Sequence, residues 1–288
     1  QTSTTNSATL NIVFTGNFYS GGGGGSALGQ GVTISGGNVG STETVNFNIS
    51  NNGSAGSPLV GNIQGGAINV NQGNGGGAWQ GQVSNNFIGN AGVANSGSTQ
   101  SSGIRVENHS PSGTMKAIVS NNTVTQWNSG PGINFQVGDT GNVSAAIDLT
   151  VTNNNVNTPG ASSQHGIVGN FGAANTGTNA VCADTKTNTI NLGAVPPNGG
   201  SNIRLRQRFG STVRLPGYGG ASGDTAAVIA FESGQNTLTP VGNVTATVQA
   251  PGGGFIGGPA CSQPTVPTFA QPDGSEGNGA EQTEDSNT

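Results

Sequence analysis

The acidic side chains that could carry out chemistry in this chain are few and scattered. Those before the C-terminal tail are Glu43, Glu107, Asp139, Asp148, Asp184, Asp224 and Glu232. Enzymes that cleave glycosidic bonds need two carboxyl groups at a defined separation, and no two of these acids are neighbours in the sequence. His109 and His165 lie among turn-forming residues. We therefore predict no catalytic residue, no cofactor and no metal site.

One set of charged residues could form a face of the molecule that binds a ligand or a cation. Its members would be Asp148, Asp184, Glu232, Arg204, Arg206 and Arg208. Asp184 and Glu232 would stack in neighbouring coils if the repeat described below keeps its register through a longer last interval. Two stacked carboxylates would repel each other, raise a pKa or bind a cation. The simpler interpretation, which we favour, is a solvated face on which charges such as Lys116 and Asp148 are partly paired.

Four of the seven basic residues are the arginines Arg204, Arg206, Arg208 and Arg214. Alternation in the segment Ile203-Arg204-Leu205-Arg206 points both of its arginines outward. They could bind an anionic polysaccharide through bidentate hydrogen bonds. They could instead hold the insertion at residues 215–224 or a C-terminal segment crossing the molecule, and we favour this second interpretation.

Two cysteines, Cys182 and Cys261, are present. A metal site would need more ligands, so the pair favours one disulfide. Cys182 is expected on an outward face, between Asp148 and Ala230 of the neighbouring coils. Cys261 follows the last repeat, and the bond would fasten a segment that runs back along the outside of the molecule.

A segment of about ten residues recurs through the chain, and it positions these side chains. It consists of an alternating apolar run, a polar pair that ends in Asn, and an apolar residue two places on. The marker asparagines are Asn17, Asn52, Asn86, Asn122, Asn154, Asn188 and Asn236, spaced 32 to 36 residues apart except for a last interval of 48. Stacked copies would share one core that a single copy cannot form.

The repeat also assigns the faces of the expected strands. The third, fifth and seventh residues before the first five markers should point inward: Phe14, Ile12, Leu10; Ile49, Phe47, Val45; Val83, Gly81, Trp79; Val119, Ala117, Met115; Val151, Leu149, Ile147. A second, shorter apolar run, such as Ile104-Arg105-Val106, follows most of them. Helical periodicity is not found over any ten residues. We expect identical positions about 4.8 Å apart in stacked coils, with a column of asparagine amides at one corner.

Composition excludes several classes of protein. Glycine numbers 53, and charged residues make up only 7% of the chain. Of the 12 acids, five lie in the last sixteen residues, which leaves seven acids against seven Lys and Arg in the body. A neutral body argues against nucleic-acid binding, and no apolar run is long enough to span a membrane. The chain lacks an initiating Met and a signal peptide, as a mature product or an excised fragment would.

Taken together, the repeat resembles the right-handed parallel β-helix proteins of the pectin-lyase-like superfold. The last third, with Val181-Cys182-Ala183-Asp184, Val213-Arg214-Leu215-Pro216-Gly217-Tyr218 and Asp224-Thr225-Ala226-Ala227-Val228, is similar to the C-terminal part of large repetitive bacterial surface proteins. The resemblance implies an exported, adhesin-like scaffold, although this superfold also hosts lyases and hydrolases.

We therefore predict an all-β, right-handed parallel β-helix of about seven coils over residues 1–261, with a Pro/Gly-rich acidic tail or linker at 262–288. The expected function is a non-catalytic extracellular structural or adhesive module at a bacterial cell surface. Its partners would be other copies, joined end to end into filaments, neighbouring repeats of the same surface protein, or a glycan. The alternative is a carbohydrate-binding or carbohydrate-cleaving β-helix.

Overall fold

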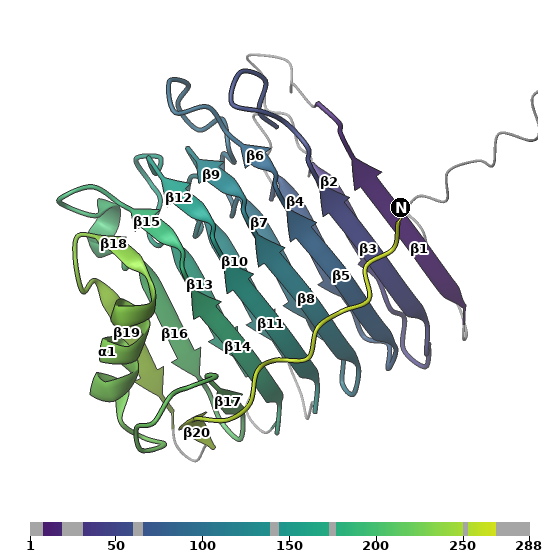
Figure 1. Ribbon diagram of the computed structural model, residues 1–288. Coiled ribbons are helices and arrows are strands. Elements are labelled where there is room, and N and C mark those ends of the chain that lie inside the picture. Colours follow the sequence, from purple (N-terminus) through teal and green to yellow (C-terminus); the bar gives the residue numbers. More distant parts are fainter. Residues whose placement is uncertain are drawn as a thin grey trace, which may run out of the picture.

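The computed structural model describes residues 8–18, 31–59, 66–138, 144–172, 177–249 and 253–268. The chain forms a parallel β-solenoid in which successive coils add strands to three sheets, stacked one upon another along the axis (Figure 1). Every strand pair between coils is parallel, and its register joins equivalent positions of the repeat, as in Phe47 beside Ile12 and Gly81. The predicted fold class is confirmed.

Three sheets form the walls of the solenoid. Sheet I has eight strands in the order β1 (Thr9–Thr15), β3 (Thr44–Ser50), β5 (Ala78–Ser84), β8 (Thr114–Ser120), β11 (Ala146–Thr152), β14 (Ala180–Lys186), β17 (Thr212–Arg214) and β20 (Gly254–Ile256). Sheet II has seven: β2 (Val32–Gly36), β4 (Ile68–Gln72), β7 (Ile104–Asn108), β10 (Ile133–Val137), β13 (Ile167–Phe171), β16 (Ile203–Gln207) and β19 (Val244–Val248). Sheet III has five: β6 (Phe87–Ile88), β9 (Thr123–Thr125), β12 (Asn155–Asn157), β15 (Thr189–Asn191) and β18 (Thr237–Thr239).

The number of complete coils is smaller than predicted. Among the described residues, five coils place a strand in all three sheets, because sheet III begins only at β6 and ends at β18. The two N-terminal coils contribute β1 with β2 and β3 with β4, and Leu59 of the second makes only an isolated bridge to Ile88. The expected seven coils are therefore about five full turns with two partial turns before them.

The core lies between the sheets and follows the alternation of the sequence. Inward residues of β3, β5, β8 and β11 are almost fully shielded from solvent, with Trp79, Phe47 and Ile147 among the largest. Gly81 interrupts the apolar column because a Cβ at that position would come within 2.6 Å of the Phe47 ring. Branched and aromatic side chains stacked in columns thus supply the apolar burial that holds the coils together.

The marker asparagines form the predicted column. Each amide nitrogen donates to the amide oxygen of the next marker at 2.9–3.2 Å, from Asn17 through to Asn236. Each amide oxygen also accepts the backbone N–H of the preceding marker, as between Asn122 and Asn154 at 3.1 Å. The residue before the marker takes the left-handed turn conformation, with φ of 55° at Asn121 and 57° at Asn153. In each polar pair, the first residue therefore makes the turn, and the second, the marker asparagine, stacks on the markers of the neighbouring coils.

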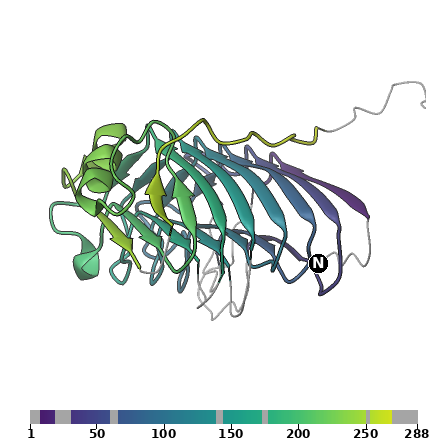
Figure 2. The same ribbon diagram turned by 90° about the horizontal axis from the view of Figure 1, so that it is seen from below.

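One helix, α1 (Thr225–Gln235), replaces the strand expected at the seventh repeat, and a short 3₁₀ turn covers Pro197–Gly199. The expectation that no ten-residue helix would form is therefore wrong. Asp224 caps α1 by accepting a hydrogen bond from the N–H of Ala227 at 2.9 Å, and three alanines favour the helix. The helix packs on β19 at the end of the stack opposite β1 (Figures 1 and 2). No helix of the described residues is long and apolar enough to cross a membrane.

After β20 the chain runs back across the outer surface of sheet I towards β1 (Figures 1 and 2). We call this segment, residues 257–268, the strap. Its contacts follow the sheet: Gln263 donates to the Thr150 hydroxyl on β11, the Thr265 N–H to Gln80 on β5, and Asn48 on β3 donates to the Pro267 carbonyl, each at 3.0 Å. Gln263, Thr265 and Pro267 of the expected tail thus contact the sheet, and residues 269–288 lie outside the described residues.

Candidate functional site

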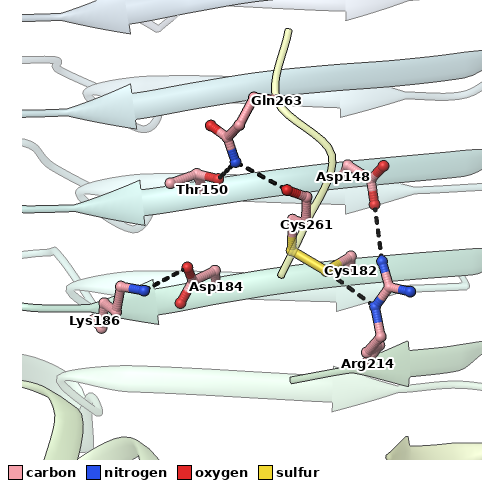
Figure 3. The surroundings of a disulfide bond; sticks show 8 residues. All are labelled: Asp148, Thr150, Cys182, Asp184, Lys186, Arg214, Cys261 and Gln263. Carbon is pink, nitrogen blue, oxygen red and sulfur yellow. Dashed lines mark hydrogen bonds and ion pairs between the residues drawn. A yellow bond between two sulfur atoms is a disulfide. The ribbon is translucent and has the colours of Figure 1, made fainter. Parts of the chain in front are cut away.

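Near its start, the strap is joined to sheet I by the predicted disulfide. Cys182 on β14 is bonded to Cys261, with a Cα–Cα distance of 5.5 Å (Figure 3). Both cysteines are buried, although Cys182 lies on the outward face of its strand, because the strap covers it. Its neighbours in the sheet are Asp148 on β11 and Arg214 on β17. The prediction that Ala230 is the second neighbour of Cys182 is wrong, since Ala230 lies in α1.

Arg214 connects this disulfide to the neighbouring acid. Its Nη2 lies 3.6 Å from Oδ1 of Asp148, and its Nε donates to the Sγ of Cys182 at 3.3 Å (Figure 3). Arg214 thus bonds to two residues of sheet I, one of them the cysteine that is bonded to the crossing segment, and it makes no hydrogen bond or ion pair to that segment itself among the described residues. A mainly apolar groove of about 440 Å³ lies beside it, with Lys116, Asp148 and Ile256 among its lining residues.

Ligand atoms of Asp148, Cys182 and Cys261 lie within 4.8 Å of one another, close enough to surround a cation. The two sulfurs are bonded to each other, and only a thiolate acts as a metal ligand. This cluster therefore offers one carboxylate, which on its own is a poor metal site.

The strap matches the sheet in spacing. Cys261 is bonded to β14 and Pro267 contacts β3, so six residues cross four strand intervals. An extended polyproline-type chain advances about 3.1 Å per residue, or about 19 Å, which equals four intervals of about 4.8 Å. Positions 261, 264 and 267 recur every three residues and are less exposed than Thr265. The prolines thus keep one face of the strap on the sheet.

The predicted stacking of Asp184 and Glu232 is wrong. Asp184 lies on β14 and pairs with Lys186 at 2.8 Å, whereas Glu232 lies on the buried side of α1. The longer last interval does not preserve the strand register because it contains a helix. Both Glu232 carboxylate oxygens lack a hydrogen-bond partner among the described residues. Burial, and secondarily the charge of Asp184, raises the pKa of Glu232 to about 8.

The remaining arginines form a separate group on sheet II. Arg204 and Arg206 alternate with buried Ile203 and Leu205 on β16, and Arg208 follows two residues later, so all three lie on the outward side. None bonds to the strap or to the insertion at residues 215–224 in the described part of the chain, which contradicts the favoured interpretation for these three. His165 lies beside them, with Nε2 2.9 Å from Nη1 of Arg204.

A buried charged cluster on β7 was missed at the sequence level. Glu107 pairs with Arg105 at 2.8 Å, lies 3.2 Å from Nε2 of His109, and accepts a hydrogen bond from Asn134 at 2.9 Å. Burial raises the pKa of Glu107, but the His109 hydrogen bond and the Arg105 charge outweigh it and lower the pKa overall. The alternation Arg-x-Glu-x-His was the available signal, because it places all three on one face.

Of the other acids, Glu43 is buried and accepts a hydrogen bond from Trp79 at 3.3 Å, and Asp224 caps α1. Asp139 lies outside the described residues. No protein-family model, curated protein or solved structure matches the chain. The order and parallel pairing of the strands show the β-solenoid, whereas the likeness to the pectin-lyase-like superfold and to bacterial surface proteins is one of sequence pattern.

Proposed function

We propose that this protein is a non-catalytic extracellular module with a structural or adhesive role at a bacterial cell surface. The observation that carries the proposal is that the acidic side chains on the outward faces of the strands are paired with basic ones. Glu107, Asp148 and Asp184 each face a basic side chain, at 2.8, 3.6 and 2.8 Å. Glycosidic cleavage would need two carboxyl groups free to exchange protons with a substrate, and these acids are instead engaged in ion pairs.

Two features of the scaffold support this proposal. A disulfide between segments 79 residues apart suits an oxidising compartment. The column of buried asparagines and the strap tie the coils together along the stacking direction, which favours a stiff rod. Such a rod presents polar side chains in regular rows, a form suited to adhesion or to spacing other domains.

Incubation with pectate, polygalacturonate and alginate tests the absence of catalysis. We expect no new reducing ends and no unsaturated products over a day, with the heat-denatured protein as the blank. Turnover that disappears in Asp184→Ala, but persists in the matched variant Asn46→Ala on the same sheet, would overturn the proposal in favour of a polysaccharide lyase or hydrolase.

Self-association through the coil ends is part of the proposal, with a second copy or a neighbouring repeat of the same surface protein as the partner. It is supported by β1, whose second edge pairs with no strand among the described residues. Unpaired strand edges invite pairing with another chain.

A carbohydrate-binding role is the second candidate, and one specific observation favours it. Arg204, Arg206 and Arg208 lie together on sheet II without any carboxylate near enough for an ion pair in the described part of the chain. Screening the purified protein on an array of neutral and acidic glycans tests this role. Retention of acidic glycans alone is the expected result, and an array without any retention would contradict it.

A further inference from the structure

The three arginines form a row with regular spacing. Strand residues two apart project on the same side about 6.6 Å from each other, so the row Arg204, Arg206 and Arg208 spans about 13 Å along β16 and just beyond it. In the neighbouring strands, Thr245 and Thr247 on β19 flank the first two arginines and are exposed. The row is therefore accessible from the side of β19.

The positive charge of this row is not neutralised within the described chain. Arg105, Lys186 and Arg214 each pair with a carboxylate. Arg206 and Arg208, by contrast, make no side-chain hydrogen bond or ion pair with the described residues. Burial, followed by the charges of Arg204 and Arg208, lowers the pKa of Arg206. Like charges held this close destabilise the protein unless an anion joins them.

His165 provides an independent indication of a missing acceptor. The backbone N–H of Ser201 donates to Nδ1 of His165 at 2.9 Å, so Nε2 carries the proton of the neutral ring. Arg204 can only donate, and its Nη1 lies 2.9 Å from that same Nε2. Two donors thus face each other. A ligand oxygen bound beside both nitrogens would accept from each and let the two donors move apart, which removes this conflict.

The surrounding side chains suit a sugar polymer. Asn170 on β13 lies beside Arg206, and its buried amide oxygen accepts no hydrogen bond from the described residues. The exposed hydroxyls of Thr245 and Thr247 offer donors and acceptors for sugar hydroxyls, and the Asn170 amide would join them after a rotation of its side chain. The strand positions that flank Arg204 and Arg206 are Val168, Asn170, Thr245 and Thr247, which include no aromatic ring on which a base could stack.

We propose that the arginine row, with His165 and Asn170, binds an acidic polysaccharide by pairing with its successive carboxylate or sulfate groups. This inference deepens the proposed adhesive function and rests on it. The ligand is bound and released unchanged, so no bond is made or broken.

Isothermal titration of the full chain tests the proposal, with polygalacturonate and dextran sulfate as acidic probes and dextran as the neutral one. We expect the acidic polymers to bind and dextran not to bind. Arg206→Gln should weaken binding about tenfold or more, because it removes a charge-assisted hydrogen bond. Lys116→Gln, which removes one positive charge from sheet I, should change it less than twofold. Folding of both variants is checked by thermal melting, and the acidic polymers should raise the Tm of the wild type more than that of Arg206→Gln.

Three results would overturn the arginine row as the site. They are equal binding of dextran, equal losses in Arg206→Gln and Lys116→Gln, and tighter binding of a single-stranded oligonucleotide than of either acidic polymer at the same salt concentration. Depolymerisation of a bound probe would instead overturn the non-catalytic proposal and leave the row in place. The two failures are therefore distinguishable.

Discussion

At the scale of single residues, Glu232 is a buried carboxyl group that makes the stability of the fold depend on pH. Its pKa rises from the ordinary value of 4.5 to about 8 in the folded protein. Below pH 4.5 both the folded and the unfolded state are protonated at this residue, and the stabilising effect of the neutral form is complete. Between pH 4.5 and 8 the unfolded state loses the proton first, so the free energy of unfolding falls by about 1.4 kcal/mol per pH unit.

We therefore expect Glu232→Gln to stabilise the protein at pH 8 by up to about 5 kcal/mol, since 3.5 pKa units at about 1.4 kcal/mol each are removed. At pH 4.5 the variant should resemble the wild type. Urea denaturation at the two pH values measures both effects. Asp184→Asn is the companion variant, and it should shift the pH dependence in the same direction but less, because the Asp184 charge is the smaller cause. Equal stability of Glu232→Gln and the wild type at pH 8 would contradict this account.

The middle of the asparagine column should be more sensitive than its end. Asn122 is buried, donates to Asn154 and to the Val83 carbonyl, and accepts two hydrogen bonds from Asn86. Asn122→Ala leaves these buried partners unsatisfied, so we expect a loss of about 3 kcal/mol or more. Asn17→Ala, at the partly exposed first position, should lose about 1 kcal/mol. Urea denaturation at neutral pH compares them, and equal losses would show that stacking does not govern stability.

At the scale of elements, the sequence was sufficient to predict the strands and their faces. Inward and outward positions of β3, β5, β8 and β11 alternate as expected, because stacked coils repeat one environment at each position. The prediction failed at α1, where Ile229 and Phe231 imitate the alternation of a strand. The alanines and the Asp224 cap favour a helix at this position. The sequence feature that indicated a departure from the repeat was the spacing of 48 residues between the last two marker asparagines.

The candidate sites show why outward-facing and exposed are different properties. Cys182 faces outward but is buried by the strap, and Glu107 faces outward but is buried within an ion cluster. Alternation predicts the direction of a side chain, whereas burial depends on segments distant in sequence. For the same reason, the sequence could place the three arginines on one face but could not separate them from Arg214, which alone meets Asp148.

The disulfide should hold the strap against sheet I. Non-reducing mass spectrometry of the native protein is expected to show no free thiol, because Cys182 and Cys261 are bonded. The bond joins two cysteines that are 79 residues apart in the sequence. For a loop of this length, chain entropy gives a stabilisation of at most about 4 to 5 kcal/mol.

We expect Cys182→Ser with Cys261→Ser to lower the stability and to free the strap, while the coils stay folded. Hydrogen exchange should then accelerate at the Thr265 N–H, which donates to Gln80, and remain slow in β8 and β11. Gln263→Ala is the matched control, since it removes one strap contact and keeps the bond. Unchanged exchange at Thr265 in the double variant would show that the prolines alone hold the strap.

At the scale of the whole molecule, the two ends of the solenoid differ. At the C-terminal end the asparagine column is closed, because the amide nitrogen of Asn236 donates to the carbonyls of Thr185 and Glu232, the latter within α1. At the other end, the Asn17 oxygen accepts no hydrogen bond from the described residues, and the partly buried Leu10, Ile12 and Phe14 border the core. An open end can pair with another open end more readily than with a closed one. Such contacts are isologous and end at a dimer, whereas head-to-tail contacts would build a filament.

The open edge of β1 offers a direct test of this assembly. The Ala8 carbonyl and the Gly16 N–H bond to β3, so even-numbered residues face that strand and odd-numbered ones face the free edge. Val13→Pro therefore removes a free-edge donor without breaking a hydrogen bond to β3. We expect sedimentation at high concentration to show a dimer for the wild type and for the control Val13→Thr, which keeps the donor, and a monomer for Val13→Pro. A dimer that survives Val13→Pro would place the interface elsewhere, and filaments seen by electron microscopy would show that α1 does not close the C-terminal end.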